Sequence, residues 1–368
     1  MDQNNQVMGA TRAPGPKDNS PPPWASAICA GQKDSGETVG QECTCTVDLM
    51  NIVEDCSVAW VNVTVKDIKN DVMKVASVMG FSTNLVEAVS SDQVSDFEDF
   101  ETEMGVKMPA LRTVGLDVEV HDLFILVRRG LVLTIHDAKV IRFNRLLRYS
   151  RTFIRKKIEP DDKWNDKLTI LLTRVIDENN TRNFESLRKI EEQGDKLNKS
   201  LLDPKTKRTE LGEEIYKMKH ALITYLDALW ACLDVIHDLQ YGDADMMSDD
   251  PRLLQIIGVL GQDITTQISL GEHMSEVLAS GLEVLQSIYN NQLQVLNNRL
   301  AFLAAWLAVV GTAVLVPNTL GTIFGIPAIS EQMDWKIMAI CLMLSTVGAV
   351  WFTMYVIRKK GWIPHSLE

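Results

Sequence analysis

The stretch LAFLAAWLAVVGTAVLVPNTLGTIFGIPAIS, residues 300–330, contains no charged side chain. A second uncharged stretch, IMAICLMLSTVGAVWFTMYVI, covers residues 337–357. A transmembrane helix needs about 20 mostly apolar residues, so each stretch is long enough to cross a bilayer once. We therefore predict a first transmembrane helix at residues 299–324, a tight turn at residues 325–336, and a second transmembrane helix at residues 337–357.

Basic residues flank this pair of spans at both outer ends. Arg299 precedes the first span, and Arg358 opens a basic tail at residues 358–368, whereas the turn holds two acids and one lysine. Because cytoplasmic segments carry the excess of lysine and arginine, we expect both termini in the cytoplasm and the turn outside. The first residues, MDQNNQVMGATRAPG, have no apolar core, so we expect no cleavable signal peptide. The predicted location is the cytoplasmic (inner) membrane.

The charge balance and the motifs exclude several classes of function. The chain has 49 acids against 37 bases, a net charge of -12, which does not favour nucleic-acid binding. Its six cysteines form no C-x2-C zinc pattern, and we expect them to be free thiols. A P-loop, G-x-S-x-G and H-E-x-x-H are all absent, so we predict that the protein is not an enzyme and has no resident cofactor.

The first 45 residues differ in composition from the rest of the chain. Gly, Pro, Ser, Asn and Asp dominate there, and three prolines stand together at residues 21–23. Such a segment has too little apolar surface to form a core. We predict a disordered leader at residues 1–45.

Residues 46–160 show the patterns of a small α/β domain. Val58–Val65 is a candidate buried strand, Gly80 is a plausible helix C-cap, and Ser82 is a plausible N-cap for a helix through Val89. Short β-type runs follow at residues 111–120, 123–127 and 131–135, with Arg128-Arg129-Gly130 as a hairpin turn. The order of these elements predicts a mostly antiparallel sheet.

Helical periodicity dominates after residue 160. Residues 161–250 carry two helical patterns separated by Asp203-Pro204, which predicts a helical hairpin. A third pattern predicts a stalk helix at residues 251–298 that runs on into the first span. A helix of about 65 residues is close to 100 Å long and cannot bury its apolar stripe against one small domain. We therefore expect a stalk in a symmetric oligomer; the alternative is that its glycines split it into ordinary packed helices.

The predicted fold class is an α+β cytoplasmic domain with a long stalk helix and two C-terminal transmembrane helices. This order of elements, from residue 46 to residue 362, resembles the CorA superfamily of divalent-cation transporters. The closest local match is PNTLGTIFG at residues 317–325, where Phe324 and Gly325 match the aromatic residue and the glycine of the family signature. The resemblance implies a homopentamer whose first membrane helix lines the pore.

Two positions depart from the family pattern. The signature reads Gly-Met-Asn in the family, whereas this chain has Gly325-Ile326-Pro327. The family's asparagine, which is thought to hold a hydrated ion at the outer mouth, is therefore missing. Ala88 stands where the family has an aspartate proposed as a regulatory metal ligand. The resemblance therefore implies the architecture, and leaves open the selectivity ring and one sensing site.

The second half of the first span carries a candidate pore face. Asn318 is the most polar residue in either span, and Thr322, Leu315 and Gly311 share its helix face. In a five-fold assembly they predict rings of amide and hydroxyl oxygens for a hydrated cation, beside a narrow apolar gate at Gly311 and Leu315. Alternatively, Asn318 satisfies the backbone that Pro317 leaves open. If Asn318 has no role, the backbone carbonyls of Gly325–Pro327 are the next candidates.

Two acids in the turn, Glu331 and Asp334, are candidates for capturing cations by their electric field, or are ordinary solvated residues. Together these features predict passive transport of divalent cations, most simply Mg²⁺ and also Co²⁺ or Ni²⁺, with a second copy of the chain and the lipid bilayer as partners. Two alternatives remain at this point. One is Zn²⁺ transport, as in the zinc-efflux branch of the same superfamily; the other is a two-span signalling or scaffold protein.

Overall fold

The computed structural model describes residues 22–43, 45–202, 208–241, 244–330 and 333–359. It divides the chain into two compact units, the first ending at Gly281 and the second beginning at Leu282. Residues 1–21 of the leader predicted at residues 1–45, and residues 360–368 of the predicted basic tail, lie outside the described residues.

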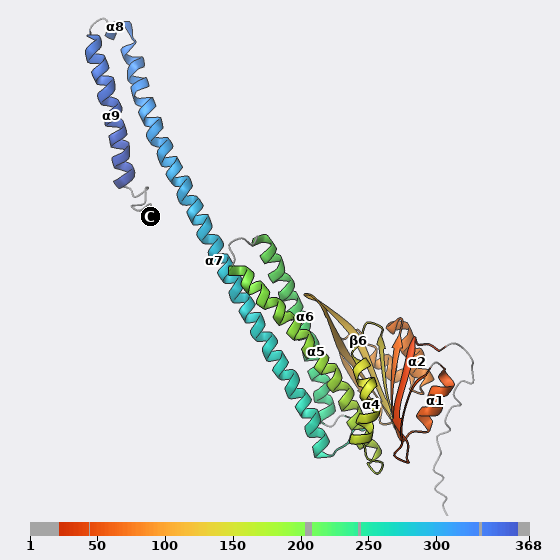
Figure 1. The fold of residues 1–368 in the computed structure, drawn as a ribbon. Coiled ribbons are helices and arrows are strands. Elements are labelled where there is room, and N and C mark those ends of the chain that lie inside the picture. The colour runs from red at the N-terminus through yellow and green to blue at the C-terminus, as the bar shows by residue number, and fades with distance from the viewer. Residues whose placement is uncertain (1–21, 44, 203–207, 242–243, 331–332, 360–368) are drawn as a thin grey trace, which may run out of the picture. The chain divides into compact units, whose positions relative to one another are not determined.

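A seven-stranded sheet forms the centre of the first unit (Figure 1). Its strands stand in the order β2-β1-β3-β7-β6-β5-β4, and the β3–β7 pair alone is parallel. The sheet is therefore mostly antiparallel, as the sequence predicts. The strands are β1 Ser26–Gln32, β2 Thr38–Cys43, β3 Val58–Val65, β4 Asp96–Asp99, β5 Glu103–Val114, β6 Asp117–Arg128 and β7 Leu131–Asp137.

The first two strands correct the prediction of a disordered leader at residues 1–45. Residues 26–43 form β1 and β2, and β1 pairs with β3 along its whole length, from Ser26 opposite Thr64 to Gln32 opposite Val58. Ala27 and Cys29 are fully buried. The small side chains of Ala27, Cys29 and Ala30 fill this part of the core, so the composition of the segment resembles that of a loop.

A second correction concerns the run at residues 111–120, which is not one strand. β5 ends at Val114 and β6 begins at Asp117, with the turn between them. Gly115 in this turn has φ +65°, a conformation that side chains with a Cβ rarely adopt. Apolar residues continue on both sides of the turn, so hydrophobicity alone does not mark it.

Helices cover both faces of the sheet and make a three-layer domain (Figure 1). One face holds α1 Thr46–Glu54, α2 Ile68–Val78 and α3 Thr83–Val89. Ser82 caps α3 as predicted, since its hydroxyl accepts a hydrogen bond from the Leu85 amide. The other face holds α4 Phe143–Lys157 and parts of α5 and α6. α4 was not predicted, because its exposed face is densely basic and its apolar stripe is short.

Three long helices complete the first unit. α5 covers Trp164–Leu202 and α6 covers Arg208–Tyr241, close to the predicted hairpin. α7 covers Pro251–Phe324 as one helix of 74 residues, so its glycines do not end it. Gly271 lies against Leu226 of α6, where a Cβ would come within 2.9 Å of the leucine side chain. Glycine at this position therefore leaves room for Leu226.

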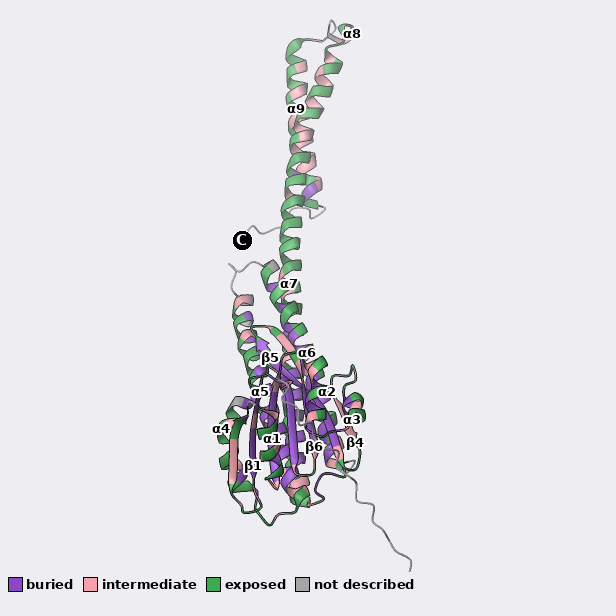
Figure 2. Ribbon diagram, turned by 90° about the vertical axis from the view of Figure 1, so that its right-hand side faces the viewer, coloured by how far each residue is buried: buried purple, intermediate pink, exposed green. Residues whose placement is uncertain are grey.

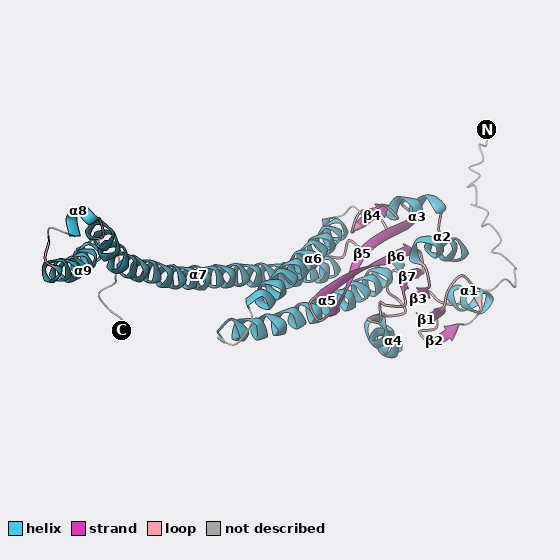
Figure 3. Cartoon of the chain, turned by 90° about the horizontal axis from the view of Figure 1, so that it is seen from above, coloured by secondary structure: helices cyan, strands magenta, loops and turns pink. Residues whose placement is uncertain are grey.

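The second unit contains only helices in its described part (Figure 3). It holds the end of α7, the short α8 Pro327–Ser330 and α9 Trp335–Lys359. α7 and α9 are each long and apolar enough to cross a membrane. In the most apolar 18-residue stretch of each helix, only 6% and 0% of the residues are buried in the single chain (Figure 2). The α+β domain, the long helix and two candidate membrane helices confirm the predicted fold class.

Candidate functional site

Four of the predicted site residues lie on one side of α7. Gly311, Leu315, Asn318 and Thr322 are spaced four, three and four residues apart, which places them within about 60° of one another around the helix. The last three are exposed, and Gly311 is half-buried. The structure thus brings these residues to a common surface, which we call the Asn318 face.

The covered residues of this part of α7 lie on the opposite side. Phe302, Val309, Val316 and Leu320 are half-buried, and Ala305 is only 5% exposed. α9 returns beside this end of α7 in the second unit (Figures 1 and 2). The hairpin therefore leaves the Asn318 face free in a single chain.

The Asn318 side chain makes no hydrogen bond among the described residues, although it follows directly on Pro317. Pro317 lies inside α7 and has no amide hydrogen to donate to the carbonyl one turn earlier. If Asn318 compensated for that loss, its amide would bond to the preceding turn, and no such bond is present in the described part of the chain. The alternative in which Asn318 only repairs the helix receives no support from this geometry.

The threonines of the span use their hydrogens within the helix. The Thr322 hydroxyl donates to the Asn318 backbone oxygen at 2.8 Å. Thr312 and Thr319 donate in the same way to Ala308 and Leu315, at 2.7 and 2.8 Å. A hydroxyl whose hydrogen is used in this way offers only its oxygen lone pairs to other groups. Thr322 thus places an acceptor oxygen one turn from the Asn318 amide.

The signature turn begins where α7 ends. Phe324 is the last residue of α7, and the Gly325 and Ile326 amides donate to the carbonyls of Gly321 and Ile323 at 3.0 and 3.2 Å. Pro327 opens α8, a position that suits a residue without an amide hydrogen. A Cβ on Gly325 would lie 3.4 Å from the nearest backbone oxygen, which is ordinary contact. Within one chain, nothing in the backbone requires glycine here.

The two acids of the turn differ in what the structure describes. Glu331 lies outside the described residues. Asp334 is exposed and precedes α9, where its carboxylate accepts the Lys336 amide at 3.4 Å and its backbone oxygen accepts the Ile337 amide at 3.0 Å. Asp334 therefore helps to start α9.

Metal-binding side chains do not gather in the part of the chain that the structure describes. Among the described residues, no group of three His, Cys, Asp or Glu side chains is placed to hold a metal ion. In the acidic turn before α7, the Asp245 amide donates to Asp99 at 2.6 Å, and Asp250 pairs with Arg252 at 2.9 Å. These acids support the fold of the first unit.

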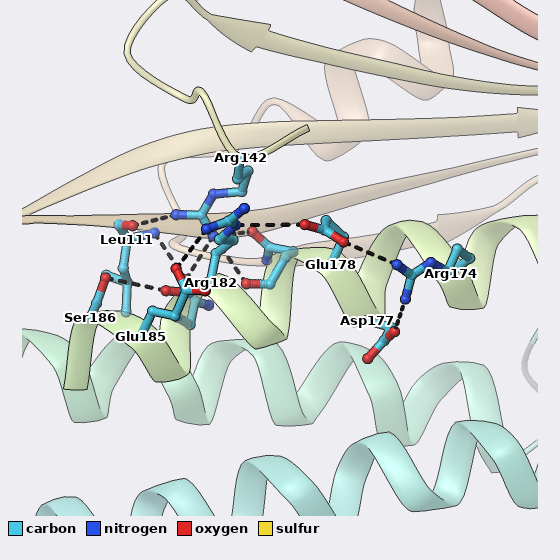
Figure 4. Close-up of polar contacts among 10 residues, drawn as sticks. Leu111, Arg142, Arg174, Asp177, Glu178, Arg182, Glu185 and Ser186 are labelled. Atoms are coloured by element: carbon cyan, nitrogen blue, oxygen red, sulfur yellow. Dashed lines mark hydrogen bonds and ion pairs between the residues drawn. The ribbon is translucent and has the colours of Figure 1, made fainter. Parts of the chain in front are cut away.

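One buried polar cluster in the first unit was not predicted. Arg142 donates from Nη1 to the side-chain oxygens of Asn179 and Asn183, at 2.5 and 2.8 Å, and from Nη2 to the Leu111 backbone oxygen (Figure 4). Burial lowers the pKa of the Arg142 guanidinium to about 10. The sequence did offer a signal for this cluster, namely two asparagines four residues apart on the inward side of α5. Buried polar groups need hydrogen-bond partners, so this pair could have predicted a polar partner from another element.

Comparisons with known proteins support the fold described above. The family model described as CorA-like Mg²⁺ transporter protein matches residues 56–359. The complete structure of the CorA magnesium transporter from Methanocaldococcus jannaschii is similar, with a TM-score of 0.65 and 19% identity, over 92% of this chain and 98% of that chain. The full-length CmaX protein is similar with a TM-score of 0.61 and 12% identity, over 93% and 99%.

The soluble domain of the same archaeal CorA matches with a TM-score of 0.56 and 19% identity, over 72% of this chain and 98% of that chain. No curated protein sequence matches this chain. The family model spans most of the sequence, including both candidate membrane helices, and members of the family are transporters rather than enzymes. The chain is therefore a membrane protein that belongs to the family of CorA-like divalent-cation transporters.

Proposed function

We propose that this protein is a passive channel for divalent cations, with Mg²⁺ as its main cargo, in the cytoplasmic membrane. The channel is a homopentamer in which the Asn318 face of α7 lines the central pore. One observation carries the proposal: the Asn318 amide is exposed and has no hydrogen-bond partner in the described chain, at membrane depth. Polar groups are tolerated at that depth only where they face protein or a water-filled interior.

The chemistry of the face suits a hydrated ion. Mg²⁺ gives up its waters reluctantly, and those waters direct their hydrogens away from the ion. The pore must therefore offer acceptor oxygens. Asn318 supplies an amide oxygen, and Thr322 supplies a hydroxyl oxygen whose own hydrogen is donated to the backbone at 2.8 Å. Leu315 and Gly311, further along the same face, form the apolar constriction that gates by losing its water.

The exposed apolar surface of α7 supports an oligomer. Large apolar residues along the span are about half exposed or more in the single chain. They include Leu300, Leu303, Leu307, Val310, Val314 and Leu315. A Cβ built on Gly311 or Gly321 meets no atom within 4 Å, so both glycines leave room for a neighbouring helix. We propose five copies, which the likeness to CorA supports, with Asp334 in an acidic ring at the outer mouth.

The ligand atoms that the Asn318 face offers to a cation are oxygens, which favours a hard cation. Mg²⁺ binds oxygen ligands, whereas Zn²⁺ is bound mainly by nitrogen and sulfur. Cys341 on α9 is the one thiol in the two predicted spans, and it does not lie on the Asn318 face of α7. Zn²⁺ transport is therefore the second candidate, favoured by the departure from the family's Gly-Met-Asn at Ile326 and Pro327.

A flux assay with purified protein in liposomes tests the proposal. Mg²⁺, Zn²⁺, Co²⁺ and Ni²⁺ are offered separately outside vesicles that hold a matching indicator, with an inside-negative potential. A divalent ion gains about 4.6 kcal/mol per 100 mV, so a passive channel must respond steeply to this potential. We expect Mg²⁺ entry that rises with the potential and needs no other energy source. Entry of Zn²⁺ alone selects the second candidate, and no entry of any of the four ions contradicts a channel.

A further inference from the structure

A cavity of about 290 Å³ lies in the first unit, whereas the residues of the Asn318 face belong to the second. Its walls are the β5–β6 hairpin, the loop after β7 and one side of α5. Five lysines and arginines line it against one carboxylate, Glu185, in a chain whose net charge is -12. The basic residues are Arg112, Lys139, Arg142, Arg182 and Lys189. Such a local reversal of charge attracts anions.

The positive charge at the inner end of the cavity is not fully compensated. All of the hydrogen bonds found for Arg142 end on neutral oxygens, those of Leu111, Asn179 and Asn183. The neighbouring Arg182 pairs with Glu185 at 2.6 Å and faces Glu178 at 3.6 Å (Figure 4). Glu178 and Glu185 act on Arg142 from a distance, but they are paired with Arg174 and Arg182. An anion in direct contact with the guanidinium would therefore stabilise Arg142 further.

The outer bases are also short of carboxylate partners. Glu119 is shared by Arg112 at 3.9 Å, by Lys139 at 4.0 Å and by His121 at 3.2 Å. Lys189 has no ion pair among the described residues. Asp137 also pairs with His121 at 3.0 Å, so Glu119 is left with Arg112 and Lys139. With Lys189, three basic side chains of the rim share one carboxylate, and the rim of the cavity therefore stays positive.

Thr113 is the second and independent sign of a ligand. It lines the cavity, is 8% exposed, and its hydroxyl has no hydrogen-bond partner in the described part of the chain. A buried hydroxyl without a partner is less favourable than one bonded to water. A ligand oxygen in the cavity would supply the missing partner.

We propose that this cavity binds the phosphate group of a small soluble metabolite. Guanidinium groups bind phosphate oxygens through paired hydrogen bonds, and lysines add charge. The bound group lies between the β5–β6 hairpin and α5, so binding ties the sheet to the helical hairpin. This site is separate from the ion pathway, and the test below does not depend on transport.

Calorimetric titration of the detergent-purified, full-length protein tests the proposal. The titrants are inorganic phosphate, pyrophosphate and ATP, each with EDTA so that no divalent cation is carried along, at constant ionic strength. We expect saturable binding of pyrophosphate and of ATP. Binding of ATP without binding of pyrophosphate would show recognition of the base rather than of phosphate, and would overturn the proposal.

Three variants and a matched control make the test specific. Lys139→Gln and Lys189→Gln remove exposed side chains of the rim, and each should weaken pyrophosphate binding roughly tenfold, the low end for a hydrogen bond to a charged group. Thr113→Val removes the unpartnered hydroxyl and should also weaken binding. Arg188→Gln removes an exposed base next to Lys189 that does not line the cavity. Absence of saturable binding, or an equal loss in Arg188→Gln, would contradict the site.

Discussion

Replacing Asn318 by leucine removes the amide from the proposed pore face and keeps a side chain of similar size. The Asn318 amide has no hydrogen-bond partner in the described chain, so the change breaks no bond within the helix. Leucine also has a higher helix propensity than asparagine. We therefore expect the variant to assemble and to melt at or above the temperature of the unchanged protein.

The loss of flux can be estimated from the hydrogen bonds that five amides offer to the waters of a passing ion. Each contributes about 0.5–1.5 kcal/mol, so five contribute roughly 5 kcal/mol. If only half of this is realised at once, ion occupancy falls by roughly 60-fold, since 1.4 kcal/mol corresponds to a factor of ten. Mg²⁺ entry into proteoliposomes should fall by at least that factor.

Thr319→Val is the matched control for this variant. Thr319 lies on the same helix but on another side, and its hydroxyl is bonded to Leu315 at 2.8 Å. This change should leave flux within about twofold, since a hydroxyl already bonded to the helix offers little to the pore. Equal flux from oligomers of the unchanged protein and of Asn318→Leu would refute the assignment, and would move the site to the carbonyls of Gly325–Pro327.

Three further predictions concern other parts of the chain. Gly31→Ala should lower the free energy of unfolding by about 1–3 kcal/mol, because the new Cβ would lie 2.9 Å from the Val58 backbone oxygen. Gly212→Ala is the control: its new Cβ would have no atom within 4 Å, so thermal melts should show no loss of stability. Burial lowers the pKa of His136 below its usual 6.5, so the unfolded chain binds a proton that the folded one does not. Stability should therefore fall as the pH drops below about 6.5, and His136→Gln should flatten this slope in denaturant titrations, whereas an unchanged slope would refute it. In a background without native cysteines, Asp334→Cys should react with an impermeant thiol reagent added outside intact cells, and labelling only after lysis would reverse the topology.

The parts of the fold that depend on local pattern could be read from the sequence. The spans follow from two uncharged runs, and the long helices follow from the spacing of residues such as Leu168, Leu172 and Val175, which are all buried. β1 could not be recognised in this way, because Ala27, Cys29 and Gly31 become core only through their pairing with β3. Small residues carry little hydrophobic signal by themselves.

The same distinction applies to the two sites. The Asn318 face could be predicted because its residues lie within one helix, at intervals of three and four. The cavity around Arg142 could not, because Leu111, Arg142 and Asn179 lie more than 30 positions apart and meet only after folding. In the proposed pentamer the pore forms between copies of the chain, so its lining depends on assembly as well as on the sequence of one helix.

Electron cryomicroscopy of the purified protein in lipid nanodiscs with Mg²⁺ can show directly whether Asn318 faces a central pore. We expect five copies around one axis, with the Asn318 side chains facing that axis and a hydrated ion near the Asn318 and Thr322 rings. An assembly of another size, or Asn318 turned toward lipid or toward α9, would contradict it.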